Sequence, residues 1–134
     1  MENDNARLLA ANQAFYDAFA SGDFHTLSAL WSRSDAVTVI HPGSRALHGR
    51  QAVMDSWEQI LDTSGGSDIR CEDARAYVHG DYAYVICKEI FPVGRLIATN
   101  IFLREDGDWR MLHHQAGPDN QSMQHDADTS TSLH

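Results

Sequence analysis

The sequence has few basic residues and no long apolar run. Ten Lys and Arg stand against nineteen Asp and Glu, which gives a formal net charge of -9. A nucleic-acid binder needs a basic face to neutralise phosphates, and docking on anionic lipid needs one as well. No apolar stretch reaches the length of a transmembrane helix. We therefore expect neither nucleic acid nor a membrane as a partner.

Cysteine is also scarce. The two cysteines, Cys71 and Cys87, both lie in strand-like segments. They could pair only if the strands place them well, so buried free thiols in a reducing compartment are the simpler interpretation. The N-terminal Met-Glu-Asn-Asp is acidic and polar, unlike a secretory signal. These features favour a cytoplasmic location.

The length and composition fit one domain. With 134 residues, 43% of them hydrophobic, the chain can bury a sizeable core. We place this domain at residues 1–118. Residues 119–134 are polar, lack periodicity and contain no Lys or Arg, so we expect a flexible tail there.

Hydrophobic periodicity predicts three helices mixed with one short strand, followed by four long strands. The predicted helices cover residues 5–20, 24–32 and 50–61, and the strands cover residues 36–41, 69–79, 82–91, 95–104 and 109–116. Gly22 suits the left-handed position after the first helix, and Asp23 can cap the second. The strand at 82–91 is apolar at both alternating positions, so both its faces must be covered. Helices cover one face, and a second copy of the chain, a homodimer through the open sheet face, is the economical cover for the other.

Several short motifs recur in a recognisable order. They are FYDAFASGD at 15–23, Leu30-Trp31, His41-Pro42-Gly43, LHGR at 47–50, Ser56-Trp57, Thr99-Asn100, DGDWR at 106–110 and HHQ at 113–115. Together they resemble the SnoaL-like branch of the nuclear transport factor 2-like (ketosteroid isomerase-like, cystatin-like fold) superfamily over residues 5–118. The resemblance implies an α+β fold: a cone of strongly bent antiparallel sheet wrapped around three N-terminal helices, with one internal pocket.

The resemblance also limits the function. Such proteins include steroid isomerases, dehydratases, polyketide cyclases and oligomerisation domains of kinases, so the fold alone names no reaction. We expect a protein that binds a small, largely apolar, oxygen-bearing molecule. If it is an enzyme, it is a cofactor-independent isomerase, dehydratase or cyclase acting by proton transfer. The alternative is a non-catalytic ligand-binding or dimerisation module.

The resemblance marks two residues at strand positions that carry catalytic groups in steroid isomerases. His41 stands where a carboxylate moves the proton, and imidazole can do this near neutral pH. Its alternative role is a hydrogen bond to a loop backbone. Asn100 stands where a protonated acid donates to the substrate oxygen, and an amide can donate too. The second isomerase donor, a helix tyrosine, falls on Phe15, which has no hydroxyl.

Glu89 alternates with Val85, Cys87 and Phe91, and the kinase association domains carry a pocket arginine at this position. An inward Glu89 would be a buried acid with a raised pKa, suited to proton transfer. In the opposite register Lys88 would face inward instead.

His113 and His114 are strand neighbours and must face opposite sides. His113 shares its parity with Trp109 and Met111, so we expect His113 in the pocket as a donor and His114 at the dimer face. His41, Glu89 and His113 could meet around a metal, but no metal-binding spacing is present, and we expect no metal and no cofactor. The expected ligand-binding lining is aromatic with one amide: Phe15, Trp31, Trp57, Phe91, Phe102 and Gln115.

Overall fold

The computed structural model describes residues 3–64 and 66–119. Within them the chain forms α1 (Asp4–Ser21), α2 (Phe24–Leu30), β1 (Thr38–Ile40), β2 (Ala46–His48), α3 (Arg50–Ser64), β3 (Arg70–His79), β4 (Tyr82–Phe91), β5 (Gly94–Glu105) and β6 (Asp108–Pro118). The three predicted helices and four long strands are all present. The pair β1 and β2 replaces the single predicted strand at 36–41, because β2 continues the chain back along β1 after the turn at Pro42-Gly43.

The start of α2 follows the sequence signals. Gly22 ends α1 in the left-handed region at φ 71°, where glycine carries no Cβ penalty. The Asp23 side chain then accepts a hydrogen bond from the backbone N–H of Thr26 and caps α2. This tight junction turns the chain from α1 into α2 within two residues.

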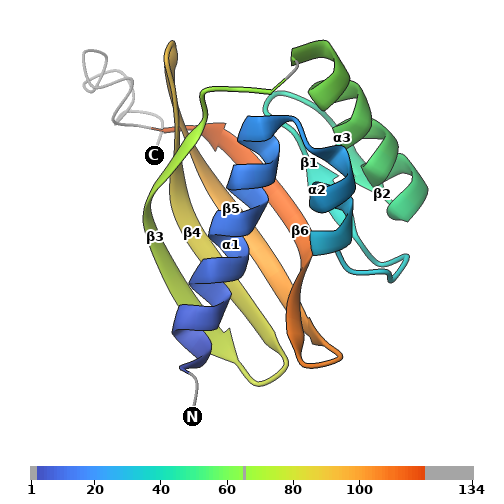
Figure 1. Cartoon of the computed structure of the whole chain (residues 1–134), viewed down its shortest axis with the longest axis vertical. Helices are drawn as coiled ribbons and strands as arrows, with labels where there is room; N and C mark the ends of the chain where they lie inside the picture. The colour runs from blue at the N-terminus through green and yellow to red at the C-terminus, as the bar shows by residue number, and fades with distance from the viewer. Residues whose placement is uncertain (1–2, 65, 120–134) are drawn as a thin grey trace, which may run out of the picture.

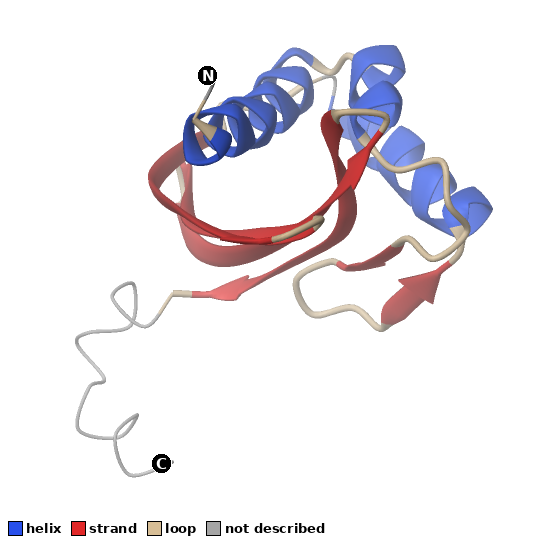
Figure 2. Cartoon of the chain, turned by 90° about the horizontal axis from the view of Figure 1, so that it is seen from below, coloured by secondary structure: helices blue, strands red, loops and turns tan. Residues whose placement is uncertain are grey.

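The strands form one sheet in the order β2-β1-β6-β5-β4-β3. Neighbouring long strands are antiparallel, as predicted, but β1 pairs with β6 in parallel. The sheet is therefore mixed. β1 and β6 lie far apart in the sequence and are not joined by a hairpin, which would make them antiparallel. The sheet curls beneath α1, and α3 lies over the side that carries β1 and β2 (Figures 1 and 2).

Helix α1 lies across the concave face of the sheet (Figure 2). The buried core residues come from all three helices and from the sheet. Trp31, Trp57, Phe15 and Phe102 are at most 1% exposed and lie within one apolar cluster. The α+β cone expected from the resemblance is confirmed. No helix in the described part of the chain is both long and apolar enough to span a bilayer.

Candidate functional site

Five polar side chains meet inside this apolar core. Asn12 and Tyr16 extend from α1, Glu89 from β4, Asn100 from β5 and His114 from β6. All five are at most 2% exposed. Burying a polar group costs free energy unless the group is hydrogen-bonded. Five connected polar side chains in an apolar core are therefore a candidate functional site rather than ordinary packing. We refer to these five residues as the polar cluster.

Glu89 is the acid of the polar cluster. The Tyr16 hydroxyl donates to Glu89 Oε2 over 2.7 Å, and His114 Nε2 lies 3.7 Å from the same oxygen. Burial raises the pKa of Glu89 to about 7, although the hydrogen bond from Tyr16 opposes the rise. The side chain therefore exchanges its proton near neutral pH, as a general acid or base must. The inward orientation expected for Glu89 is confirmed.

The hydrogen bonds fix the proton on His114. The Asn100 side-chain nitrogen donates to Asn12 Oδ1 over 2.8 Å and to Tyr16 Oη over 3.1 Å, so the Asn100 oxygen faces His114. His114 Nδ1 lies 2.5 Å from that oxygen and must be the protonated nitrogen. Nε2 is then an unprotonated acceptor facing Glu89. Burial lowers the pKa of His114 to about 3, which keeps the ring neutral.

Tyr16 keeps its proton throughout the physiological range. Burial is the main cause that raises the pKa of its hydroxyl well above the usual value, and the nearby Glu89 raises it further. The hydroxyl is therefore a permanent donor that bridges the acid and the amide. Tyr16 directly follows Phe15 in the sequence, and neighbours on a helix are rotated by about 100° from each other. In the structure both side chains face the core from α1, and their rings meet edge to face with centroids 4.9 Å apart.

The prediction for the two adjacent histidines was wrong. His113 faces the opposite side of the sheet, where Nδ1 hydrogen-bonds to Thr38 Oγ1 over 2.6 Å, and His114 faces inward. A β-bulge causes the exchange. Ile101 pairs with His113 and Phe102 pairs with Met111, so Leu112 is an extra residue on β6. Beyond this bulge the inward and outward positions swap.

The same bulge places Gln115 outside. Gln115 is exposed and shares the outer face with His113, so its predicted place in the pocket lining was also wrong. His114 takes the inward position, with Phe15 and Trp57 packed against its ring at centroid distances of 5.5 and 5.4 Å. Alternation of apolar residues cannot reveal such a bulge, because it depends on the pairing with β5.

His41 lies at the edge of this region. Its Nε2 is 3.0 Å from Ser56 Oγ, and its ring meets Trp57 edge to face with centroids 4.8 Å apart. Burial lowers its pKa. Trp57 contacts the rings of both His41 and His114, and the hydrogen bonds of the polar cluster do not include His41. The structure thus brings together Glu89 and Asn100 from the predicted catalytic set, but not His41 or His113.

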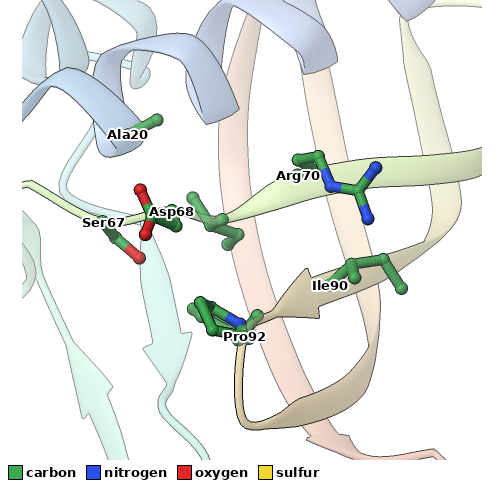
Figure 3. Close-up of a pocket in the computed structure, with 8 residues that line it drawn as sticks. Ala20, Ser67, Asp68, Arg70, Ile90 and Pro92 are labelled. Atoms are coloured by element: carbon green, nitrogen blue, oxygen red, sulfur yellow. The ribbon is translucent and has the colours of Figure 1, made fainter.

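The predicted aromatic lining has two parts. Phe15, Trp31, Trp57 and Phe102 pack in the core around the polar cluster. Phe91 is half-buried and lines a separate cavity of about 530 Å³. The other lining residues are Ala20, Ser67, Asp68, Ile69, Arg70, Ile90 and Pro92, from the end of α1, the segment before β3 and the end of β4 (Figure 3).

This cavity lies close to Glu89 along the sheet. Phe91 is two residues beyond Glu89 on β4, and Ile69 is two residues before Cys71, the β3 partner of Glu89. Residues two apart on a strand face the same side, about 7 Å from each other. Ile69 and Phe91 therefore lie on the face that carries Glu89, whereas the lining residues Arg70 and Ile90, a cross-strand pair, lie on the opposite face.

Three buried tryptophans have an indole N–H without an acceptor. They are Trp31, Trp57 and Trp109. The rings of Trp31 and Trp57 lie 6.2 Å apart by centroids. Within the described residues, no three His, Cys, Asp or Glu side chains are grouped to hold a metal ion.

Comparison with known proteins gives the family. The SnoaL-like domain matches residues 8–118. Among curated proteins, the F-box protein SKIP8 of Arabidopsis thaliana is 27% identical over 111 residues, which cover 81% of this chain. The match covers 48% of that relative, so the chain spans about half of its length.

Two solved structures are similar in both sequence and fold. One is a candidate dehydratase of the nuclear transport factor 2-like family from Streptomyces avermitilis, with 32% identity, a TM-score of 0.79 and coverage of 87% of this chain and 96% of that one. The other is a candidate calcium/calmodulin-dependent protein kinase type II association domain from Thiobacillus denitrificans, with 31% identity, a TM-score of 0.76 and coverage of 83% and 94%. From the matched domain and these structures, this chain belongs to the SnoaL-like domain family, within the nuclear transport factor 2-like superfamily.

Proposed function

We propose that this protein binds a small, largely apolar, oxygen-bearing compound and catalyses cofactor-independent proton transfer on it. The observation that carries the proposal is the buried Glu89, whose pKa is raised to about 7 and whose carboxyl oxygen contacts both Tyr16 and His114. An acid tuned to neutral pH inside an apolar core has the properties of a general acid or base. Isomerisation, dehydration and cyclisation all use such a group.

The first step we propose is proton abstraction from a carbon beside a carbonyl. The Glu89 carboxylate takes the proton, and the electron pair of the C–H bond moves towards the carbonyl oxygen to form an enolate. Glu89 in its acid form no longer needs the Tyr16 hydroxyl, which can then donate to the enolate oxygen. Return of the proton to another carbon gives isomerisation. Proton donation to a hydroxyl leaving group gives dehydration.

His114 supports Glu89 in this scheme. Its neutral ring presents the Nε2 lone pair 3.7 Å from Glu89 Oε2. That nitrogen can accept a hydrogen bond from the acid form of Glu89, while Asn100 holds the ring through Nδ1. Substrate would enter from the cavity at Phe91, which follows the same inward face of β4.

Deuterium exchange tests the proposal without a known substrate. The protein is incubated in D2O with a panel of small apolar ketones and enones, and loss of α-proton signals is followed by NMR. We expect exchange above the buffer rate, with Glu89→Gln lowering it by about 10²–10⁴-fold. The matched control is Glu58→Gln, an exposed glutamate of α3, which should exchange at the wild-type rate.

Two results would count against catalysis. Equal exchange by the wild type and Glu89→Gln would remove Glu89 from the reaction. Ligands that bind tightly but show no exchange would support the alternative, a binding protein without chemistry. The similarity to the candidate dehydratase from Streptomyces avermitilis, at 32% identity, supports catalysis over binding alone.

We further propose that two copies of the chain pair through the outer face of the sheet. This face carries half-buried Ile86 and Ile101, together with Tyr77, Tyr82 and Ile97, which are 41%, 56% and 39% exposed. Apolar side chains on the open face of a sheet favour a protein partner. The similarity to a candidate association domain supports a second copy as that partner.

A further inference from the structure

Two thiols lie beside the polar cluster on neighbouring strands. The Asn12 side-chain nitrogen is 3.5 Å from Cys71 Sγ on β3 and 4.0 Å from Cys87 Sγ on β4. Both cysteines are free, with Cys87 buried and Cys71 half-buried. One amide nitrogen thus contacts both sulfurs.

A second β-bulge brings the two cysteines together. Cys71 pairs with Glu89, and Cys87 is the next inward position on β4. Asp73 and Ala74 lie together opposite Cys87, and Asp73 takes a left-handed φ of 54°. A bulge of this kind increases the local twist of the strand pair. It leaves the thiols as diagonal neighbours on the concave face.

The two thiols differ in acidity. The neighbouring Cys71 thiol is the largest cause lowering the pKa of Cys87, and Tyr16 and Asn12 add to it. The same contact, together with burial, raises the pKa of Cys71. Because the thiolate is the nucleophile, Cys87 is the more reactive sulfur and Cys71 the proton-bearing neighbour.

We propose that Cys71 and Cys87 form a reversible oxidation site, in which a hydroperoxide converts the two thiols into a disulfide between β3 and β4. The oxidant must be small, because Cys87 is buried and the half-buried Cys71 is the more exposed of the two thiols. Low-pKa cysteines beside a second thiol are the usual arrangement in redox-sensitive sites.

The chemistry proceeds in two balanced steps. The Cys87 sulfur attacks the terminal peroxide oxygen and the O–O bond breaks, which gives a sulfenic acid on Cys87. The leaving group is hydroxide from hydrogen peroxide or alkoxide from an alkyl hydroperoxide, and it is protonated to water or an alcohol. The Cys71 sulfur then attacks the Cys87 sulfur, the S–O bond breaks, and the second oxygen leaves as water with the Cys71 proton. Two thiols are oxidised and one hydroperoxide, or hydrogen peroxide itself, is reduced.

Oxidation would also change the surroundings of Glu89. Tyr16 Oη lies 3.4 Å from Cys87 Sγ as well as 2.7 Å from Glu89 Oε2. A disulfide removes the thiol proton of Cys87 and moves the sulfur atom that the Tyr16 hydroxyl contacts. On the proposed function, oxidised protein would therefore show altered exchange activity, but formation of the disulfide does not depend on any turnover.

The test treats the reduced, folded protein with hydrogen peroxide and measures its intact mass and free thiols. We expect a mass loss of two hydrogen atoms, loss of both thiols, and recovery of both with dithiothreitol. Cys71→Ser should stop at the sulfenic acid, which dimedone labels on Cys87. Cys87→Ser should leave Cys71 unmodified at the same dose. Circular dichroism checks that each variant is folded, and an alanine variant at the same position replaces any serine variant that is not.

Three results would overturn the proposal. One is retention of both thiols in the folded protein under conditions that oxidise the unfolded chain. Another is a disulfide between chains, seen as a covalent dimer on a non-reducing gel. The third is dimedone labelling of Cys71 rather than Cys87 in the single-cysteine variants. Each readout is independent of substrate, so failure of the proposed function leaves this test intact.

Discussion

Tyr16 of α1 and Glu89 of β4, separated by 73 residues in the sequence, are joined by a hydrogen bond of 2.7 Å in the core. The same hydroxyl accepts a hydrogen bond from Asn100. Tyr16 thus links the helix to two strands and sets the environment of the only buried carboxyl group in the polar cluster. Removing this hydroxyl should affect both stability and acid strength.

Tyr16→Phe should raise the pKa of Glu89 further, because the hydrogen bond from Tyr16 is what opposes the effect of burial. It should also destabilise the fold by about 1–2 kcal/mol, because Asn100 loses an acceptor and Glu89 a donor. Carbon-13 NMR of labelled glutamate measures the pKa, and urea unfolding measures the stability. Phe15→Leu is the control, since it perturbs the same part of α1 but leaves the hydroxyl in place. A lowered Glu89 pKa in Tyr16→Phe would contradict this account of the site.

Glu89→Gln should change how stability depends on pH. The folded state holds the Glu89 proton up to about pH 7, whereas the unfolded chain releases it near the usual value of 4.5. Between these values the folded state binds more protons, so the contribution of Glu89 to stability falls as pH rises. Relative to the wild type, Glu89→Gln should gain about 3 kcal/mol from pH 4 to pH 8. Parallel unfolding curves for the two proteins at every pH would show that Glu89 ionises normally.

The contribution of His114 to folding stability should depend on pH in the opposite direction to that of Glu89. Its folded pKa is lowered to about 3, so between pH 6.5 and 3 the unfolded chain takes up a proton that the folded state refuses. Stability due to His114 is complete above pH 6.5 and declines as the pH falls through this window. His114→Gln, which supplies an amide N–H donor in place of the ring, should reduce this loss of stability at acidic pH. Proton NMR of the imidazole ring offers a direct check, because a His114 resonance that titrates near pH 6.5 would exclude a neutral buried ring.

His41→Ala separates the two candidates for the base. The resemblance to steroid isomerases assigns the base to His41, whereas the contacts with Tyr16 and His114 favour Glu89. We expect His41→Ala to retain most of the deuterium exchange and Glu89→Gln to lose it. Loss of exchange in folded His41→Ala protein, with Glu89→Gln still active, would return the base role to His41.

The proposed dimer can be tested by sedimentation at micromolar concentration. We expect a dimer for the wild type and a monomer for Ile97→Asp, because a charge on the outer sheet face would lose hydration on pairing. Val93→Asp is the matched control. Val93 is 97% exposed at the turn before β5, beyond the strands that form this face, and its substitution should leave the dimer unchanged. A monomeric wild-type protein at this concentration would contradict the proposed dimer.

The sequence predicted the elements well because local signals marked them. Gly22 and Asp23 marked the junction between α1 and α2. The strand that became β4 is apolar at both alternating positions, so the inward place of Glu89 was expected from the resemblance to the kinase association domains. The order of motifs then identified the family. These signals depend on neighbours in the sequence, so they needed no knowledge of strand pairing.

The errors arose where distant pairing decides the outcome. The bulge at Leu112 is set by β5, and it exchanged the predicted faces of His113 and His114. Tyr16 was missed because the comparison with isomerases drew attention to Phe15, although a tyrosine in a helix full of alanines was itself a visible signal. Asn12 was missed because its contact with Asn100 depends on how α1 lies across the sheet.

The extra residue on β6 also affects how sequences related to this one should be compared. A relative without the bulge would carry one residue fewer between Met111 and the strand end, and its inward side chain would occupy the second position after that methionine. An ungapped alignment would then match that side chain to His113, although its spatial counterpart is His114. A single gap opposite Leu112 restores the correspondence, so counting the histidine as shared or absent across relatives depends on where that gap is placed.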